Sequence, residues 1–185
     1  MRHLTNALTT LTALGLAVSL VACNDTDDAA DLDANQGAAE TQQTASDWLA
    51  DGEPTGAAAL ADVKAAAAEG DAVLVRARIG GRAEPMSPDS PVFLVVDLSL
   101  KHCGELPGDN CPMPWDYCCE PRDSLTANSA TVQLVDDAGS PLAVDLTQSL
   151  EPLDVVVIEG VVGPRPSPEV LTIKATKIHR ATTEG

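Results

Sequence analysis

Four cysteines gathered in one segment are the residues of this chain best suited to chemistry. They follow the spacing C-x7-C-x6-C-C and are Cys103, Cys111, Cys118 and Cys119. Thiolate sulfur binds Zn²⁺ and, because it is a soft ligand, also Cu(I). The same thiols can instead form two disulfides, and a bond between the neighbours Cys118 and Cys119 is then strained. The pairings that remain are 103–118 with 111–119, and 103–119 with 111–118.

Other donors lie close to the cysteines in the sequence. His102 precedes the first cysteine and Met113 lies between the second and the third, so both are possible additional metal ligands. The spacing lacks the paired C-x2-C of zinc ribbons, and adjacent ligands at 118 and 119 are awkward for one tetrahedral ion. Two interpretations stay open: a disulfide framework with no cofactor, or a site for Cu or Zn.

Catalytic motifs are not apparent in the sequence. It shows no Ser-His-Asp order, no Gly-rich phosphate loop and no H-E-x-x-H. The sequence also lacks a C-x-x-C pair at the amino terminus of a predicted helix, the motif that would suggest thiol redox chemistry. We therefore predict that the protein is not an enzyme and has no catalytic residues.

The fifth cysteine ends an apolar run near the amino terminus. Arg2 and His3 come first, the apolar run extends over 7–22, and Cys23 follows Leu-Val-Ala. A basic start, an apolar centre and a small residue at the cut are typical of a secretory signal peptide. The segment resembles the lipobox of bacterial lipoproteins, in which this cysteine is lipidated and becomes the first residue of the mature chain. The resemblance implies a signal peptide over 1–22 and a lipid anchor at Cys23.

The lipobox resemblance also predicts a location. An acylated Cys23 holds the chain on membrane lipid in the cell envelope, outside the cytoplasm. Some Gram-negative bacteria retain lipoproteins at the inner membrane when aspartate follows the cysteine. Because Asn24 follows here, the periplasmic face of the outer membrane is favoured. Export also places the remaining thiols where disulfides can form.

The acidic composition argues against one class of partner. The chain has a net charge of −17, whereas nucleic-acid binding depends on Lys and Arg that neutralise phosphates. Residues 24–53 carry nine carboxylates and no Lys or Arg. We expect 23–54 to be a flexible tether, with Trp48 and Leu49 docking on the domain that follows.

The rest of the chain, 55–185, must position the cysteines. Thr55 is a suitable N-cap for a helix over 56–69 that stops at Gly70. Hydrophobic patterns predict strands at 73–79, 91–96, 131–135, 142–146, 155–162 and 171–175. Short strands separated by loops favour an all-β fold: one N-terminal helix followed by a small five- to six-stranded barrel. The cysteine-rich segment is an insertion over 101–128, with too much Pro and Gly for regular structure.

The strand sequences resemble those of exported bacterial OB-fold proteins. The resemblance rests on DAVLVRARIGG (71–81), VFLVVDLSL (92–100), TVQLV (131–135), LDVVVIEGVVG (153–163) and VLTIKATKIH (170–179). It implies an OB-like barrel with ligand-binding loops, where Arg82 and Arg165 fall. Two departures are the insertion and a reduced helix at 147–152. Phe93 is the one aromatic residue available on the central strands, which again argues against nucleic acid.

A second resemblance concerns copper. Some periplasmic OB-fold metallochaperones bind Cu(I) with Met and His against a Trp ring. Met113, His102 and Trp115 supply those residue types here, but their positions do not match that family's strands, so no site is transferred.

Two function hypotheses follow from the sequence. In the first, the protein is a membrane-anchored, non-catalytic binding module, and Trp115 and Tyr117 form an exposed patch for an unknown envelope protein or small ligand. In the second, the same loop binds Cu or Zn in the periplasm.

Overall fold

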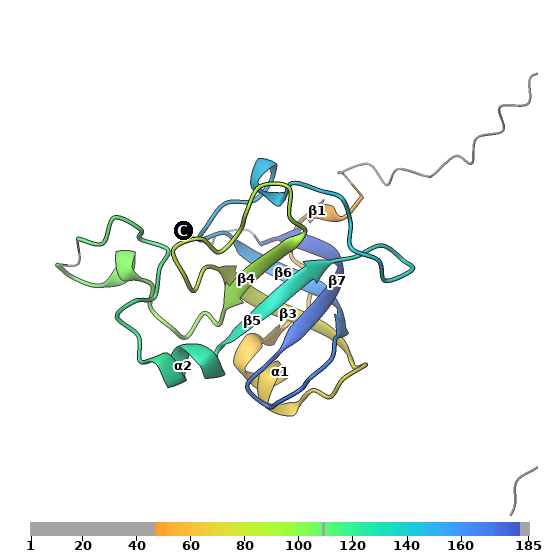
Figure 1. The fold of residues 1–185 in the computed structure, drawn as a ribbon, viewed down its shortest axis with the longest axis horizontal. Coiled ribbons are helices and arrows are strands. Elements are labelled where there is room, and N and C mark those ends of the chain that lie inside the picture. The colour runs from red at the N-terminus through yellow and green to blue at the C-terminus, as the bar shows by residue number, and fades with distance from the viewer. Residues whose placement is uncertain (1–46, 109, 182–185) are drawn as a thin grey trace, which may run out of the picture. The chain divides into compact units, whose positions relative to one another are not determined.

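The computed structural model describes residues 47–108 and 110–181. The predicted signal peptide, Cys23 and the tether up to residue 46 lie outside the described residues. Five strands close a barrel, which confirms the predicted small all-β barrel (Figure 1). The barrel strands are β3 (Ala72–Ile79), β4 (Val92–Val96), β5 (Ser129–Leu134), β6 (Val155–Val162) and β7 (Thr172–Arg180).

The strands follow a closed order around the barrel. β3 pairs with β4, β4 with β5, β5 with β7, β7 with β6, and β6 returns to β3. All these pairs are antiparallel except β5 with β7, which is parallel. Gly160 marks a register shift between β6 and β7, where an added Cβ would lie 2.3 Å from the Lys174 carbonyl oxygen. A side chain cannot fit there, so this glycine permits the bend that closes the barrel.

Two short strands extend the sheet beyond the barrel. β1 (Leu49–Asp51) runs parallel to β7, and β2 (Ala58–Ala59) runs parallel to β3. The Trp48 carbonyl accepts a hydrogen bond from the Ile178 N–H at 2.8 Å, and its side chain is buried in the core. The expected docking of Trp48 is therefore confirmed, and the folded part begins before Thr55.

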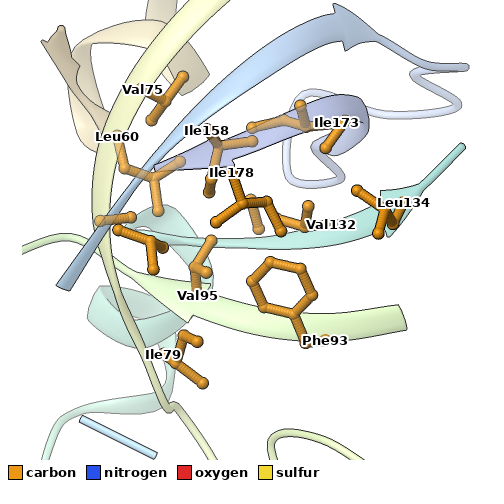
Figure 2. Packing of buried hydrophobic residues seen from close by; sticks show 14 of the residues in the cluster. Leu60, Val75, Ile79, Phe93, Val95, Val132, Leu134, Ile158, Ile173 and Ile178 are labelled. Atoms are coloured by element: carbon orange, nitrogen blue, oxygen red, sulfur yellow. The ribbon is translucent and has the colours of Figure 1, made fainter. Parts of the chain in front are cut away.

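One apolar core fills the barrel. Alternate residues of β3, among them Val75, Ala77 and Ile79, point inward and are fully buried. Figure 2 shows Phe93 and Val95 of β4 facing Ile158 of β6 across this interior. The core continues through β5 and β7, as alternation in those segments predicts.

The predicted strand at 142–146 is wrong. Only an isolated bridge joins Val135 and Pro141, and the chain then forms a 3-10 helix, η2 (Leu146–Gln148). The Asp145 carboxylate accepts a hydrogen bond from the Thr147 N–H at 3.0 Å and so caps this turn. Leu146 and Leu150 are buried on the core without strand pairing.

The helix α1 (Leu60–Ala66) is shorter than the predicted 56–69. Thr55 does not cap it, because β2 precedes the helix and the Asp97 carboxylate accepts a hydrogen bond from the Ala61 N–H at 2.9 Å. Figure 1 shows α1 beside one end of the barrel. Leu60 and Val63 are buried against the core. Among the described residues, no helix is long and apolar enough to cross a membrane.

Candidate functional site

The segment 101–128, called the Cys loop below, joins β4 to β5. The chain leaves and re-enters the barrel at neighbouring points, since the Asp97 N–H donates to the Asn128 carbonyl at 2.8 Å. Contrary to the prediction, the loop contains regular structure. A 3-10 helix, η1 (Cys103–Glu105), follows β4, and a helix, α2 (Arg122–Ala127), precedes β5. Figure 1 shows this segment (green) projecting to one side of the barrel.

Two arms of the Cys loop are joined by their backbones. The Cys103 N–H donates to the Asp116 carbonyl at 2.8 Å, and the Gly104 N–H donates to the Pro114 carbonyl at 3.0 Å. The His102 ring adds a third link, with Nδ1 lying 2.8 Å from the Pro114 oxygen. These bonds hold Cys103 against the arm that carries Cys118.

The loop rests on the barrel through Tyr117 and Trp115. Tyr117 is 1% exposed, and its ring lies against Gly80, where an added Cβ would be 3.0 Å from the ring atom Cε2. The half-buried Trp115 donates its indole N–H to the Ala83 carbonyl at 2.8 Å. The predicted exposed patch of Trp115 and Tyr117 is therefore corrected: Tyr117 lies under the loop because Gly80 leaves room for its ring.

Three of the four loop cysteines come together. The sulfur atoms of Cys103, Cys111 and Cys118 all lie within 4.8 Å of one another. The Cys103 and Cys118 sulfurs are 3.4 Å apart, well beyond the roughly 2.05 Å of a disulfide. No disulfide joins any of the four loop cysteines, so the predicted disulfides are not formed in this structure. Cys119 lies outside the group of three, with its sulfur 4.0 Å from that of Cys118.

The three thiols differ in environment. Cys103 is buried, Cys111 is half-buried and Cys118 is exposed. Burial raises the pKa of the Cys103 thiol, and the hydrogen bond with Cys118 raises it further. Backbone N–H groups of Cys118 and Cys119 and the Cys111 thiol act in the opposite direction on that pKa. The Cys103 sulfur is thus protonated at neutral pH yet surrounded by donors that could stabilise its thiolate.

Of the other predicted metal ligands, His102 does not belong to the group of three sulfurs. The His102 Nδ1 faces the Pro114 carbonyl, and its Nε2 lies 3.5 Å from a Glu105 carboxylate oxygen. Met113 is half-buried, and its carbonyl accepts a hydrogen bond from the Cys111 thiol at 3.4 Å. Both residues therefore shape the loop in this structure.

The two loop arginines have different surroundings. Arg82 is exposed, and its Nε donates to the Glu84 carbonyl at 2.6 Å. Arg165 binds carbonyls of this chain: it donates to Lys64, Ala67, Pro168 and Val170. Because two of these carbonyls belong to the carboxyl end of α1, the Arg165 guanidinium caps that helix.

Arg165 also faces a buried lysine. Lys64 is 7% exposed, and its ammonium donates to the carbonyls of Thr126 and Ser129. Burial lowers the pKa of Lys64, and the positive charge of Arg165 lowers it further. The sequence did not predict this role for Lys64. The carbonyls that its ammonium binds belong to Thr126 and Ser129, more than 60 positions away in the chain. The lysine fastens the end of the Cys loop to α1.

Comparisons with profiles of protein families, with curated proteins and with solved structures found no match to this chain. The sulfurs of Cys103, Cys111 and Cys118 are close enough together to bind one metal ion. Such a group of thiols can bind a soft metal ion, or two of its members can be oxidised to a disulfide.

Proposed function

We propose that this protein is a membrane-anchored, non-catalytic envelope protein whose Cys loop binds a soft metal ion. The ligands are the thiolates of Cys103, Cys111 and Cys118, and Cu(I) is the favoured ion, with Zn²⁺ as the alternative. The observation that carries the proposal is the placement of these three sulfurs within 4.8 Å of one another.

The separations fit a metal–thiolate site. A metal–sulfur distance of about 2.3 Å places ligand sulfurs about 3.8–4.0 Å apart in tetrahedral or trigonal geometry. The Cys103 and Cys118 sulfurs, 3.4 Å apart, are slightly closer than that range, and all three sulfurs lie within 4.8 Å of one another. Soft thiolates select Cu(I) or Zn. Three sulfurs complete a trigonal Cu(I) site, whereas Zn²⁺ needs a fourth ligand.

The surroundings of the site support binding rather than catalysis. The ligands come from a loop whose arms are joined by the Cys103–Asp116 and Gly104–Pro114 backbone hydrogen bonds. The buried ring of Tyr117 fixes one arm on Gly80. Ligands held in place before the ion arrives lose less entropy on binding.

The barrel supports a finer description of the fold. Numbered along the barrel, its strands follow the order 1-2-3-5-4, with the third and fifth parallel. This is the arrangement of OB-folds, which bind ligands in the loops between strands. An OB-like barrel that carries its site in the loop between its second and third strands is the architecture we propose.

The location rests on the amino-terminal sequence. The apolar run that ends at Cys23 resembles a lipobox, and the acidic segment after it suits a tether that holds the barrel near the bilayer. A lipid-anchored protein of this kind could bind metal ions at the membrane surface of the periplasm.

A second function is favoured by one distance. The sulfurs of Cys103 and Cys118 lie 3.4 Å apart, and an exported chain meets conditions in which thiols oxidise. A disulfide there would pin the loop without a cofactor. The half-buried Trp115 of the same loop would then contact an envelope protein or small ligand.

Anaerobic titration of the reduced, full-length protein with Cu(I) in competition with a chromophoric Cu(I) chelator tests the proposal. We expect one Cu(I) per chain and loss of binding by about tenfold or more when Cys111 is replaced by serine. Ser124→Ala, in the helix α2 of the same loop, is the matched control and keeps wild-type affinity. Equal binding by Cys111→Ser and wild type would contradict the proposal.

A further inference from the structure

We propose that Cys119 is the exchange ligand of the site: its thiol takes the metal ion from a donor thiol complex at the surface and passes it through Cys118 to the buried Cys103. This inference rests on the proposed function and adds the route by which the ion enters. The donor class is a Cu(I) complex of a low-molecular-weight thiol or of an exposed protein thiol.

The first observation is a row of sulfurs that runs inward. The Cys119 sulfur lies 4.0 Å from that of Cys118, and the Cys118 sulfur lies 3.4 Å from that of Cys103. Exposure falls along the same row, since Cys119 and Cys118 are exposed whereas Cys103 is 1% exposed. An ion can therefore move between adjacent sulfurs without leaving sulfur coordination.

The second observation is the turn that presents the two outer thiols. The Glu120 N–H donates to the Tyr117 carbonyl at 3.0 Å, so Cys118 and Cys119 occupy the two central positions of a four-residue turn. The first residue of that turn, Tyr117, is buried on the barrel. The turn is fixed at its base, and both central thiols are held at the surface.

The third observation separates Cys119 from the permanent ligands. Its sulfur lies outside the group of three whose members are all within 4.8 Å of one another. A trigonal site is complete without it. A fourth thiol whose sulfur lies 4.0 Å from a ligand of a complete site can hold the incoming ion while the donor leaves.

The exchange conserves charge and needs no oxidant. The Cys119 sulfur forms a bond to the metal, one bond between the metal and a donor sulfur breaks, and the Cys119 thiol proton goes to the departing donor thiolate. The same step follows at Cys118, Cys111 and Cys103, and each of these thiols gives up one proton as its sulfur binds the metal. The bond between the metal and the Cys119 sulfur then breaks, and the Cys119 thiolate takes up a proton again. The metal keeps its oxidation state throughout.

Stopped-flow transfer of Cu(I) from its glutathione complex to the reduced, full-length protein tests this route. For Cys119→Ser we expect uptake and release to slow by about tenfold or more, while stoichiometry is unchanged and equilibrium affinity changes by less than about threefold. Cys119→Met, which keeps a sulfur donor, should restore part of the rate. Cys118→Ser is the contrasting variant, and its main effect should be a loss of affinity.

The outcomes are distinguishable. Transfer rates of Cys119→Ser equal to those of wild type would overturn the exchange role while leaving the metal site intact. A loss of affinity in Cys119→Ser as large as in Cys118→Ser would make Cys119 a permanent ligand and also overturn the role. No Cu(I) uptake by wild type would overturn the proposed function itself, and the exchange role with it.

Discussion

The barrel and the Cys loop are stabilised by different interactions. The barrel is held by a continuous apolar core in which residues such as Phe93, Val132 and Ile158 are almost completely buried. The Cys loop has two buried side chains among its described residues, those of Cys103 and Tyr117, and is held mainly by backbone hydrogen bonds between its arms. The barrel therefore supplies most of the buried core, and the loop holds a group of thiols that contributes little to that core.

Removing a side chain from the barrel core should have a much larger effect on the free energy of unfolding than removing one from the Cys loop. Phe93→Ala should destabilise the protein by about 3–5 kcal/mol, because it removes a buried ring and leaves a cavity. Met113→Ala, at a half-buried position in the Cys loop, should cost less than about 1 kcal/mol. Urea unfolding measures both, and similar losses would show that the loop belongs to the same core as the barrel.

The next effect tests the contact that joins the two regions. An added Cβ at Gly80 would lie 3.0 Å from both the Trp115 carbonyl oxygen and the Tyr117 ring. Gly80→Ala should cost about 1–3 kcal/mol by overpacking and should weaken metal binding by about tenfold or more, as the loss of a supporting contact does.

Gly163→Ala is the matched control for Gly80→Ala, because its Cβ would meet Thr172 at an ordinary 3.5 Å. Its unfolding and metal titration curves should stay close to those of wild type. Equal behaviour of the two variants would show that Gly80 does not seat the loop.

A smaller effect concerns Asp97, which lies where β4 meets the loop and caps α1. Burial alone would raise its pKa, but hydrogen bonds from Ala61, Ser99 and Leu60 outweigh it, so the pKa of Asp97 lies below its ordinary value of 3.8. The folded state thus favours the carboxylate. The stability from this group is present above pH 3.8 and is lost as the pH falls through the lower, folded value.

Asp97→Ala should cost about 1–2 kcal/mol at neutral pH, as the loss of an N-cap does. Urea unfolding at a series of acidic pH values should also show a shallower loss of stability for the variant than for wild type. Parallel curves for the two proteins would contradict the capping role.

The smallest effect concerns Arg82, on an exposed part of the loop after β3. Its Nε donates to the Glu84 carbonyl, and nothing in the core depends on it. Arg82→Ala should change the free energy of unfolding by less than about 0.5 kcal/mol and leave metal affinity unchanged. A clear loss of metal affinity would show that the site extends beyond the Cys loop.

The contrast also explains what the sequence could predict. The limits of β6 match the predicted 155–162. A buried strand is a continuous run of apolar residues, so it can be recognised from neighbouring positions in the sequence. The predicted strand at 142–146 is wrong because one side chain, that of Asp145, caps a local turn that the hydrophobic pattern does not reveal.

The loop was harder to predict because its contacts join distant residues. Tyr117 looks exposed in a Pro-rich segment, and its burial depends on the missing side chain of Gly80. Nothing in the spacing of the four cysteines separates Cys119 from the other three. That distinction arises from the turn at 117–120, whose position is set by packing on the barrel.

In the proposed function, the loop cysteines are reduced ligands for a soft metal ion. Intact mass and elemental analysis of the protein purified anaerobically from its native envelope test this claim most directly. We expect four loop cysteines in reduced form together with stoichiometric copper or zinc. A protein without metal, lighter than the reduced form by the four hydrogens that two disulfides remove, would contradict it.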